Sequence, residues 1–165
     1  MLTNLWIASS GAFYFLVYFL KYLPGDTYIT AVAIGFSCLG YMTTDYGTRK
    51  LGLFTNLVAG YGTIAILATI VIILNIIGEG VSIFTYVSIF FIIKFLVCHC
   101  YSGLYVVHIE LFDSGVLSSS YGICGLVSKF VNMSISMLCE TKNKVLPLLV
   151  FMAINLLASF ASKFL

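Results

Sequence analysis

Charged residues are scarce in this chain of 165 residues, since Asp, Glu, Lys and Arg together make up 8% of it. Soluble domains carry about 25% charged residues, and a chain with roughly a third of that fraction has too few to cover a water-facing surface. The scarcity excludes a soluble globular protein. With 61% hydrophobic residues and a mean hydropathy of +1.11, the composition predicts an all-α integral membrane protein.

Basic runs and catalytic motifs are missing as well. The net charge is only +2 and no cluster of Lys and Arg occurs, so nucleic acid is excluded as a partner. There is no His-Glu-x-x-His motif, and no Ser or Cys nucleophile has an evident histidine partner, so we expect neither an enzyme nor a cofactor. Cys98-His99-Cys100 is the one candidate metal motif. Residues two apart point to different sides of a helix, so we expect no metal site there.

Six apolar runs, each close to or above the roughly 20 residues that span a bilayer, alternate with short polar connections. The runs cover residues 5–23, 28–44, 51–77, 81–109, 116–138 and 145–165. The connections leave no room for a soluble domain, so we expect a single six-helix transmembrane domain over residues 1–165. Glycines inside the runs predict close helix–helix approach, with hinges as the alternative. They are Gly11, Gly35, Gly40, Gly60, Gly62, Gly103, Gly122 and Gly125.

Two lysines lie deep in the apolar runs. Lys94 is near the middle of the fourth run and Lys129 is about halfway along the fifth. A mid-membrane charge is costly and is by default a functional hypothesis. All six acidic residues lie at or near the ends of runs, so neither lysine has an evident counter-ion. The pattern favours a cavity that attracts anions, and water-filled packing or snorkelling to the interface remain as alternatives.

Charges also gather at the ends of two runs. Asp45, Arg49 and Lys50 follow the second run, and Glu110 ends the fourth. An even number of crossings separates them, so they lie on the same side of the membrane. An ion pair between Glu110 and this polar turn, formed in one conformation and broken in another, would act as a gate. A solvated loop is the alternative. Positive charges are divided evenly between the two sides, so they do not orient the chain.

Several short motifs match one family in order and spacing. They are Trp6-Ile7-Ala8-Ser9-Ser10, Gly25-Asp26 with Tyr28, Asp45–Lys50, Asn56–Gly60, Lys94-Phe95, Glu110-Leu111-Phe112, Gly122 with Cys124, Ser128 and Lys129, and Leu146–Phe151. Together they resemble the second half, helices seven to twelve, of a major facilitator superfamily transporter, in the branch that carries organic cations, organic anions and carnitine. The chain departs from that pattern in several places. Asp113 stands where the family has proline, Leu117 stands where it has the motif arginine, and Thr48 or Tyr46 interrupts the basic loop.

The resemblance implies alternating access, in which two six-helix halves rock around a site near the membrane midplane. In this family the seventh, tenth and eleventh helices line the substrate cavity. Trp6 and Phe13 then match aromatic cavity positions, and Lys94 matches the basic residue of the tenth helix. The position of Lys129 is acidic in cation carriers and basic in anion carriers, so lysine favours organic anions or zwitterions. The polar turn and Glu110 would lie in the cytosol, and the protein in the plasma membrane.

Two functional hypotheses follow from these observations. The first is transport of small organic ions as part of a larger or dimeric carrier, because a six-helix half needs a second half or a homodimer partner to complete the cavity. The second is a truncated or degenerate carrier half without transport activity of its own, which the missing motif arginine favours. In both cases the lipid bilayer surrounds the protein.

Overall fold

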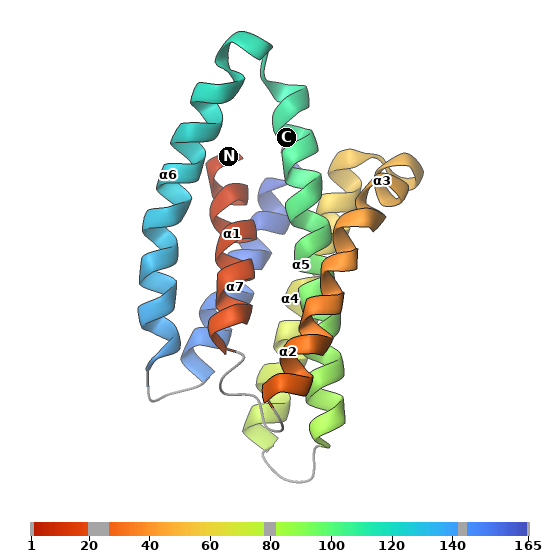
Figure 1. Ribbon diagram of the computed structural model, residues 1–165, viewed down its shortest axis with the longest axis vertical. Helices are drawn as coiled ribbons and strands as arrows, with labels where there is room; N and C mark the ends of the chain where they lie inside the picture. The colour runs from red at the N-terminus through yellow and green to blue at the C-terminus, as the bar shows by residue number, and fades with distance from the viewer. Residues whose placement is uncertain (1, 20–26, 78–81, 142–144, 165) are drawn as a thin grey trace.

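The described part of the chain is helical almost throughout (Figure 1). The computed structural model describes residues 2–19, 27–77, 82–141 and 145–164. Its elements are α1 (Leu2–Phe19), α2 (Thr27–Phe36), the 3-10 segment η2 (Ser37–Leu39), α3 (Gly40–Leu51), α4 (Leu53–Ile77), α5 (Ile83–Leu111), α6 (Ser114–Cys139) and α7 (Val145–Ala161). Because α2, η2 and α3 are continuous, they form one rod. These ranges contain no strand, which confirms the prediction of an all-α protein.

Four of the helices are long and apolar enough to cross a membrane. They are α1, α4, α5 and α6, and α7 is apolar but shorter. Large apolar side chains remain exposed along their outer faces, among them Ile66 on α4 and Phe130 on α6. Lipid is the solvent in which such faces are stable. The helices therefore agree with the membrane protein that the composition predicted.

Helix α5 is central in the bundle, and it contacts α1, α3, α4 and α6 (Figure 1). Beside it, α1 packs along α6 and α4 packs along α7. Fully buried side chains from α1, α4, α5 and α7 form the tightest part of the core. They include Leu5, Leu57, Tyr61, Leu104 and Leu148. Residues of α1, α3, α5 and α6 that are not in this core line the pockets described below.

Two glycines determine how closely α5 approaches its neighbours. A Cβ atom at Gly40 would overlap the backbone oxygen of Phe95, and one at Gly60 would overlap Sγ of Cys100. A Cβ at Gly11 would lie 2.7 Å from Cδ1 of Ile135, so α1 also approaches α6 through a glycine. The prediction of close helix contacts is confirmed at these positions. It is wrong for Gly35, Gly122 and Gly125, where nothing lies within 4 Å.

The rod formed by α2, η2 and α3, which corresponds to the second predicted run, ends later than the apolar pattern indicated. The sequence placed its end at Thr44 and a polar turn after it, but α3 continues to Leu51. Asp45 and Arg49 are four residues apart on the exposed surface of α3 and form an ion pair that supports this last stretch. The chain turns at Gly52, where φ is +81° and glycine is favoured. The predicted turn is therefore a surface helix.

The connection between α5 and α6 is short. Phe112 and Asp113 have extended backbone angles, and α6 starts at Ser114. The backbone oxygen of Asp113 accepts hydrogen bonds from the amides of Val116 and Leu117, both at 3.0 Å. The connection between the fourth and fifth predicted runs, residues 110–115, thus contains only two non-helical residues. It lies toward the same end of the bundle as α3 (Figure 1).

Candidate functional site

Lys94 lies inside the bundle, with 2% of its surface exposed. Its Nζ donates a hydrogen bond to the backbone oxygen of Phe13 at 3.3 Å. The same atom lies 3.2 Å from the centroid of the Phe13 ring. A ring face and a carbonyl oxygen both attract an ammonium group, so the charge is stabilised without a carboxylate. In this conformation Lys94 joins α5 to α1, and its ammonium group faces Phe13.

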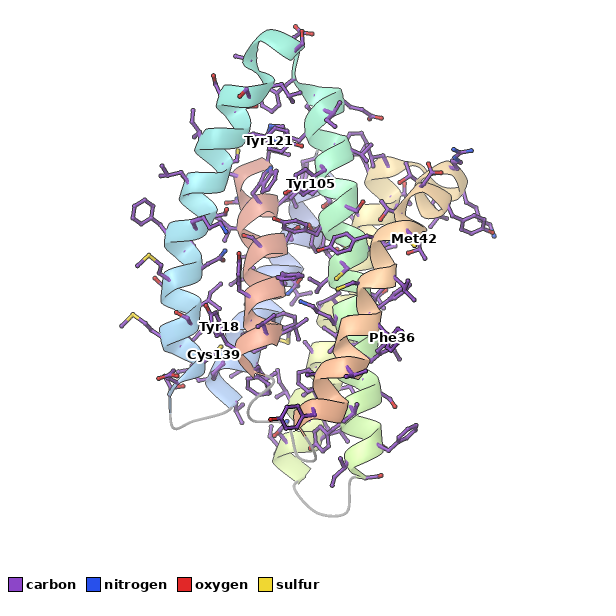
Figure 2. All side chains as sticks on the ribbon, in the orientation of Figure 1. Tyr18, Phe36, Met42, Tyr105, Tyr121 and Cys139 are labelled. Atoms are coloured by element: carbon purple, nitrogen blue, oxygen red, sulfur yellow. The ribbon has the colours of Figure 1, made fainter. Side chains whose placement is uncertain are left out.

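Lys129 has a different environment from Lys94, although both lysines lie near the middle of apolar runs in the sequence. Its side chain is exposed, and its Nζ donates to Oη of Tyr14 at 2.8 Å. No carboxylate of the described residues forms an ion pair with it. A pocket of about 240 Å³ lies beside it, between α1 and α6. The lining residues are Tyr14, Tyr18, Lys129, Asn132, Met133 and Ser136, and Figure 2 labels Tyr18 where α1 faces α6.

A second pocket, of about 200 Å³, lies between α1, α3 and α5. Its lining residues are Ser10, Phe13, Tyr14, Tyr41 and Tyr101. Tyr14 lines both pockets, so an aromatic compartment adjoins a compartment that holds a cation. An aromatic compartment stabilises a ring or a hydrocarbon body, and an ammonium group stabilises an anion. The pair of pockets is therefore chemically suited to an amphiphilic organic anion.

Trp6 is buried in an aromatic cluster, not at the edge of a cavity. Its ring makes edge-to-face contacts with Tyr105 and Tyr121, both labelled in Figure 2. The ring centroids are 5.1 Å apart for Tyr105 and 5.4 Å apart for Tyr121. Its Nε1 donates to Nδ1 of His108 at 3.1 Å. Neither Trp6 nor His108 lines the two pockets described above. The cluster therefore holds α1 against the end of α5.

The bond from Trp6 determines the state of His108. An indole N–H only donates, so Nδ1 of His108 must accept and the ring is neutral, with its proton on Nε2. That nitrogen lies 2.8 Å from Oγ of Ser120. The Ser120 hydroxyl in turn donates to the backbone oxygen of Leu117 at 2.8 Å. A chain of hydrogen bonds thus runs from α1 through α5 to the first turns of α6.

Replacing Trp6 with phenylalanine should destabilise the protein by about 1–3 kcal/mol. The smaller ring loses packing area, and Nδ1 of the buried His108 loses its donor, which leaves an unsatisfied polar atom. The measurement is the thermal unfolding of purified protein in detergent. Thr63→Val is the control, since the Thr63 hydroxyl is on the exposed side of α4 and bonds only within its own helix. Equal melting temperatures for Trp6→Phe and the control would contradict the role of this bond.

The four proposed gate residues are only partly brought together. Arg49 Nη2 lies 3.0 Å from Oδ2 of Asp45, and both side chains are largely exposed. Lys50 Nζ lies 5.9 Å from the centroid of the Tyr46 ring. Glu110 is exposed, and no ion pair joins it to a cation of the described residues. The expected pair between Glu110 and Arg49 or Lys50 is not formed in this conformation.

A buried polar cluster joins α3, α4 and α5 instead. The His99 ring nitrogens lie 2.9 Å from Oγ1 of Thr43 and 3.1 Å from Oδ1 of Asn56. The Thr44 hydroxyl also donates to the backbone oxygen of His99. Cys100, the next residue of α5, packs against Gly60 of α4 and is not part of this cluster. In the described ranges no three His, Cys, Asp or Glu side chains group together as metal ligands.

Several residues that line the two pockets were not predicted from the sequence. Tyr14, Tyr41 and Tyr101 line the aromatic pocket, and Asn132 lines the pocket beside Lys129. One signal was available for α1, because Ser10, Tyr14 and Tyr18 are spaced by four residues and so share a helix face. A second was Asn132, since an amide in an apolar run needs a hydrogen-bond partner.

Comparison with known proteins adds no family assignment. No protein-family model matches the chain, and no curated protein matches it. The motifs quoted from the sequence, together with the pockets, are what bears on function.

Proposed function

We propose that this chain is one half of a multi-pass secondary carrier of the major facilitator type, which moves small organic ions across the plasma membrane by alternating access. Organic anions or zwitterions are the favoured substrates. Lys129 carries this proposal. Its ammonium group lies beside a pocket between two apolar helices, and its described surroundings contain no carboxylate to neutralise it. A cation kept in such a place attracts an anionic ligand.

The origin of the pocket walls supports the same proposal. The two pockets are lined by α1, α3, α5 and α6. Three of these, α1, α5 and α6, correspond in the resemblance to the seventh, tenth and eleventh helices. Phe13 lines the aromatic pocket, and the ammonium group of Lys94 contacts the Phe13 ring. A second six-helix half or a second copy of the chain would supply the opposite wall.

The alternative is a degenerate carrier half that does not transport by itself. Leu117 stands in the position of the motif arginine, and Glu110 has no ion pair with Arg49 or Lys50. A carrier whose charge network cannot form would lose control of its gate. This alternative predicts a folded protein that gives no uptake under any condition.

Uptake into reconstituted vesicles distinguishes the two. Purified chain, verified as a dimer by crosslinking, is reconstituted and given labelled 3-phenyllactate, with protein-free vesicles as the background. We expect saturable uptake that an excess of unlabelled acid abolishes. A verified dimer without uptake above the background would refute transport by this chain alone and favour the degenerate half.

A further inference from the structure

Asn132 on α6 is buried with both of its side-chain polar atoms unpartnered. Its surface is 7% exposed, and neither Oδ1 nor Nδ2 has a hydrogen-bond partner among the described residues. An amide with both groups unpaired costs several kcal/mol in an apolar setting. Native proteins tolerate such groups where a ligand or water satisfies them. Asn132 also lines the pocket that contains Lys129.

The spacing on α6 brings this amide close to the cation. Lys129, Asn132 and Ser136 are three and four residues apart, so they lie on one face of the helix, and all three line the pocket. The opposite wall is α1, which approaches α6 closely at Gly11, beside the amide. A Cβ atom at Gly11 would lie 3.5 Å from Oδ1 of Asn132. Oδ1 of Asn132 therefore faces α1, next to the pocket that Asn132 lines.

We propose that Lys129 and Asn132 form a binding site for a small monocarboxylate that carries a hydroxyl or ammonium group next to its carboxylate. The inference rests on the proposed function, because it assigns a ligand class to the same pocket. The ammonium group of Lys129 pairs with one carboxylate oxygen, and Nδ2 of Asn132 donates to the other. Oδ1 of Asn132 accepts from the neighbouring hydroxyl or ammonium group. Both unpaired atoms of the amide are then satisfied.

The charge of the pocket favours a monoanion. Lys129 is the only charged side chain among the described residues that line it, and one of its donors is already used by Tyr14. A phosphate dianion would enter this apolar region with one uncompensated charge, which is costly. The hydrocarbon part of the acid has a place as well, since the aromatic pocket begins on the other side of Tyr14.

Equilibrium binding to the purified full chain in nanodiscs tests this site without requiring transport. The probe is labelled 3-phenyllactate, and the competitor is 3-phenylpropionate, which lacks only the hydroxyl. For the unchanged protein we expect phenyllactate to bind about tenfold more tightly, because the acid without the hydroxyl leaves Oδ1 unpaired. Asn132→Leu should weaken phenyllactate binding about tenfold or more and remove the difference between the two acids.

Asn155→Leu is the matched control. Asn155 is a fully buried amide on α7 with an unpaired Oδ1, and it does not line the Lys129 pocket. Its replacement should leave the affinity for both acids unchanged. If Asn132→Leu fails to give a monodisperse protein, Asn132→Asp keeps the size of the side chain, and its carboxylate should abolish phenyllactate binding by repulsion.

Three results would overturn the assignment: no binding of phenyllactate to the unchanged chain, equal affinity for the two acids, or an unaltered affinity in a folded variant at Asn132. Failure of the site and failure of transport are distinguishable. Binding that depends on Asn132 without vesicle uptake supports the site and refutes transport. Uptake that is insensitive to Asn132 supports transport and refutes the site.

Discussion

Replacing Gly40 with alanine should prevent α3 from packing against α5, whereas the same change at Gly35 should be tolerated or slightly stabilising. A Cβ at Gly40 would overlap the backbone oxygen of Phe95. A backbone atom cannot move aside as a flexible side chain can, so the two helices must separate. Overpacking typically costs about 1–3 kcal/mol, and we expect at least that loss here.

Gly35 provides a control of the same chemistry in the same rod. It lies on α2, is exposed, and has nothing within 4 Å of a Cβ atom. Alanine in an open helical position gains up to about 1 kcal/mol over glycine. The melting temperatures of the two variants in detergent, measured with size-exclusion chromatography as the readout, should therefore shift in opposite directions. A melting temperature for Gly40→Ala at or above that of Gly35→Ala would contradict the close helix contact.

Exchanging the charge of Lys129 for a carboxylate should abolish most uptake of organic anions. Lys129→Asp removes the cation beside the pocket and puts a like charge in the path of the substrate. Loss of one charge-assisted hydrogen bond costs about 1.5–3 kcal/mol, which corresponds to a factor of roughly 10–100. We expect the initial rate of phenyllactate uptake, measured well below saturation, to fall by about that factor.

Lys163→Asp is the matched charge exchange. Lys163 is exposed near the end of the described chain, where its Nζ lies 5.8 Å from the Phe160 ring centroid, and it lines neither pocket. This variant changes the net charge by the same amount and should keep normal uptake. Equal uptake by the two variants, at equal amounts of reconstituted protein, would remove Lys129 from the binding site.

The apolar runs predicted the helices well and their polar ends less well. α4, α5 and α6 begin and end within a few residues of the predicted runs. The end of the second rod was not predictable from hydropathy, because Asp45 and Arg49 read as a polar turn. Their contribution is an ion pair along the surface of a helix that only stops at Gly52. Periodic charge on a helix and a solvated loop have the same composition.

The two deep lysines show what hydropathy leaves open at a site. Both lie in mid-run positions without an acidic partner in sequence, and so one interpretation served for both. The packing of the helices gives them different environments. Lys94 is buried against Phe13, whereas Lys129 bonds to Tyr14 and lines a pocket. Phe13 and Tyr14 are adjacent in α1 and direct their contacts to different helices. Which neighbour covers a lysine depends on how helices distant in sequence pack together.

The contact between Trp6 and His108 also gives the protein a built-in optical probe. Trp6 is the single tryptophan in the sequence, so all indole emission comes from one place, where α1 meets α5 and α6. A motion that separates these helices would remove the imidazole and tyrosine rings from the indole and change its emission. The rocking step of the proposed transport cycle would then be visible in unlabelled protein, as a fluorescence change that follows the addition of phenyllactate.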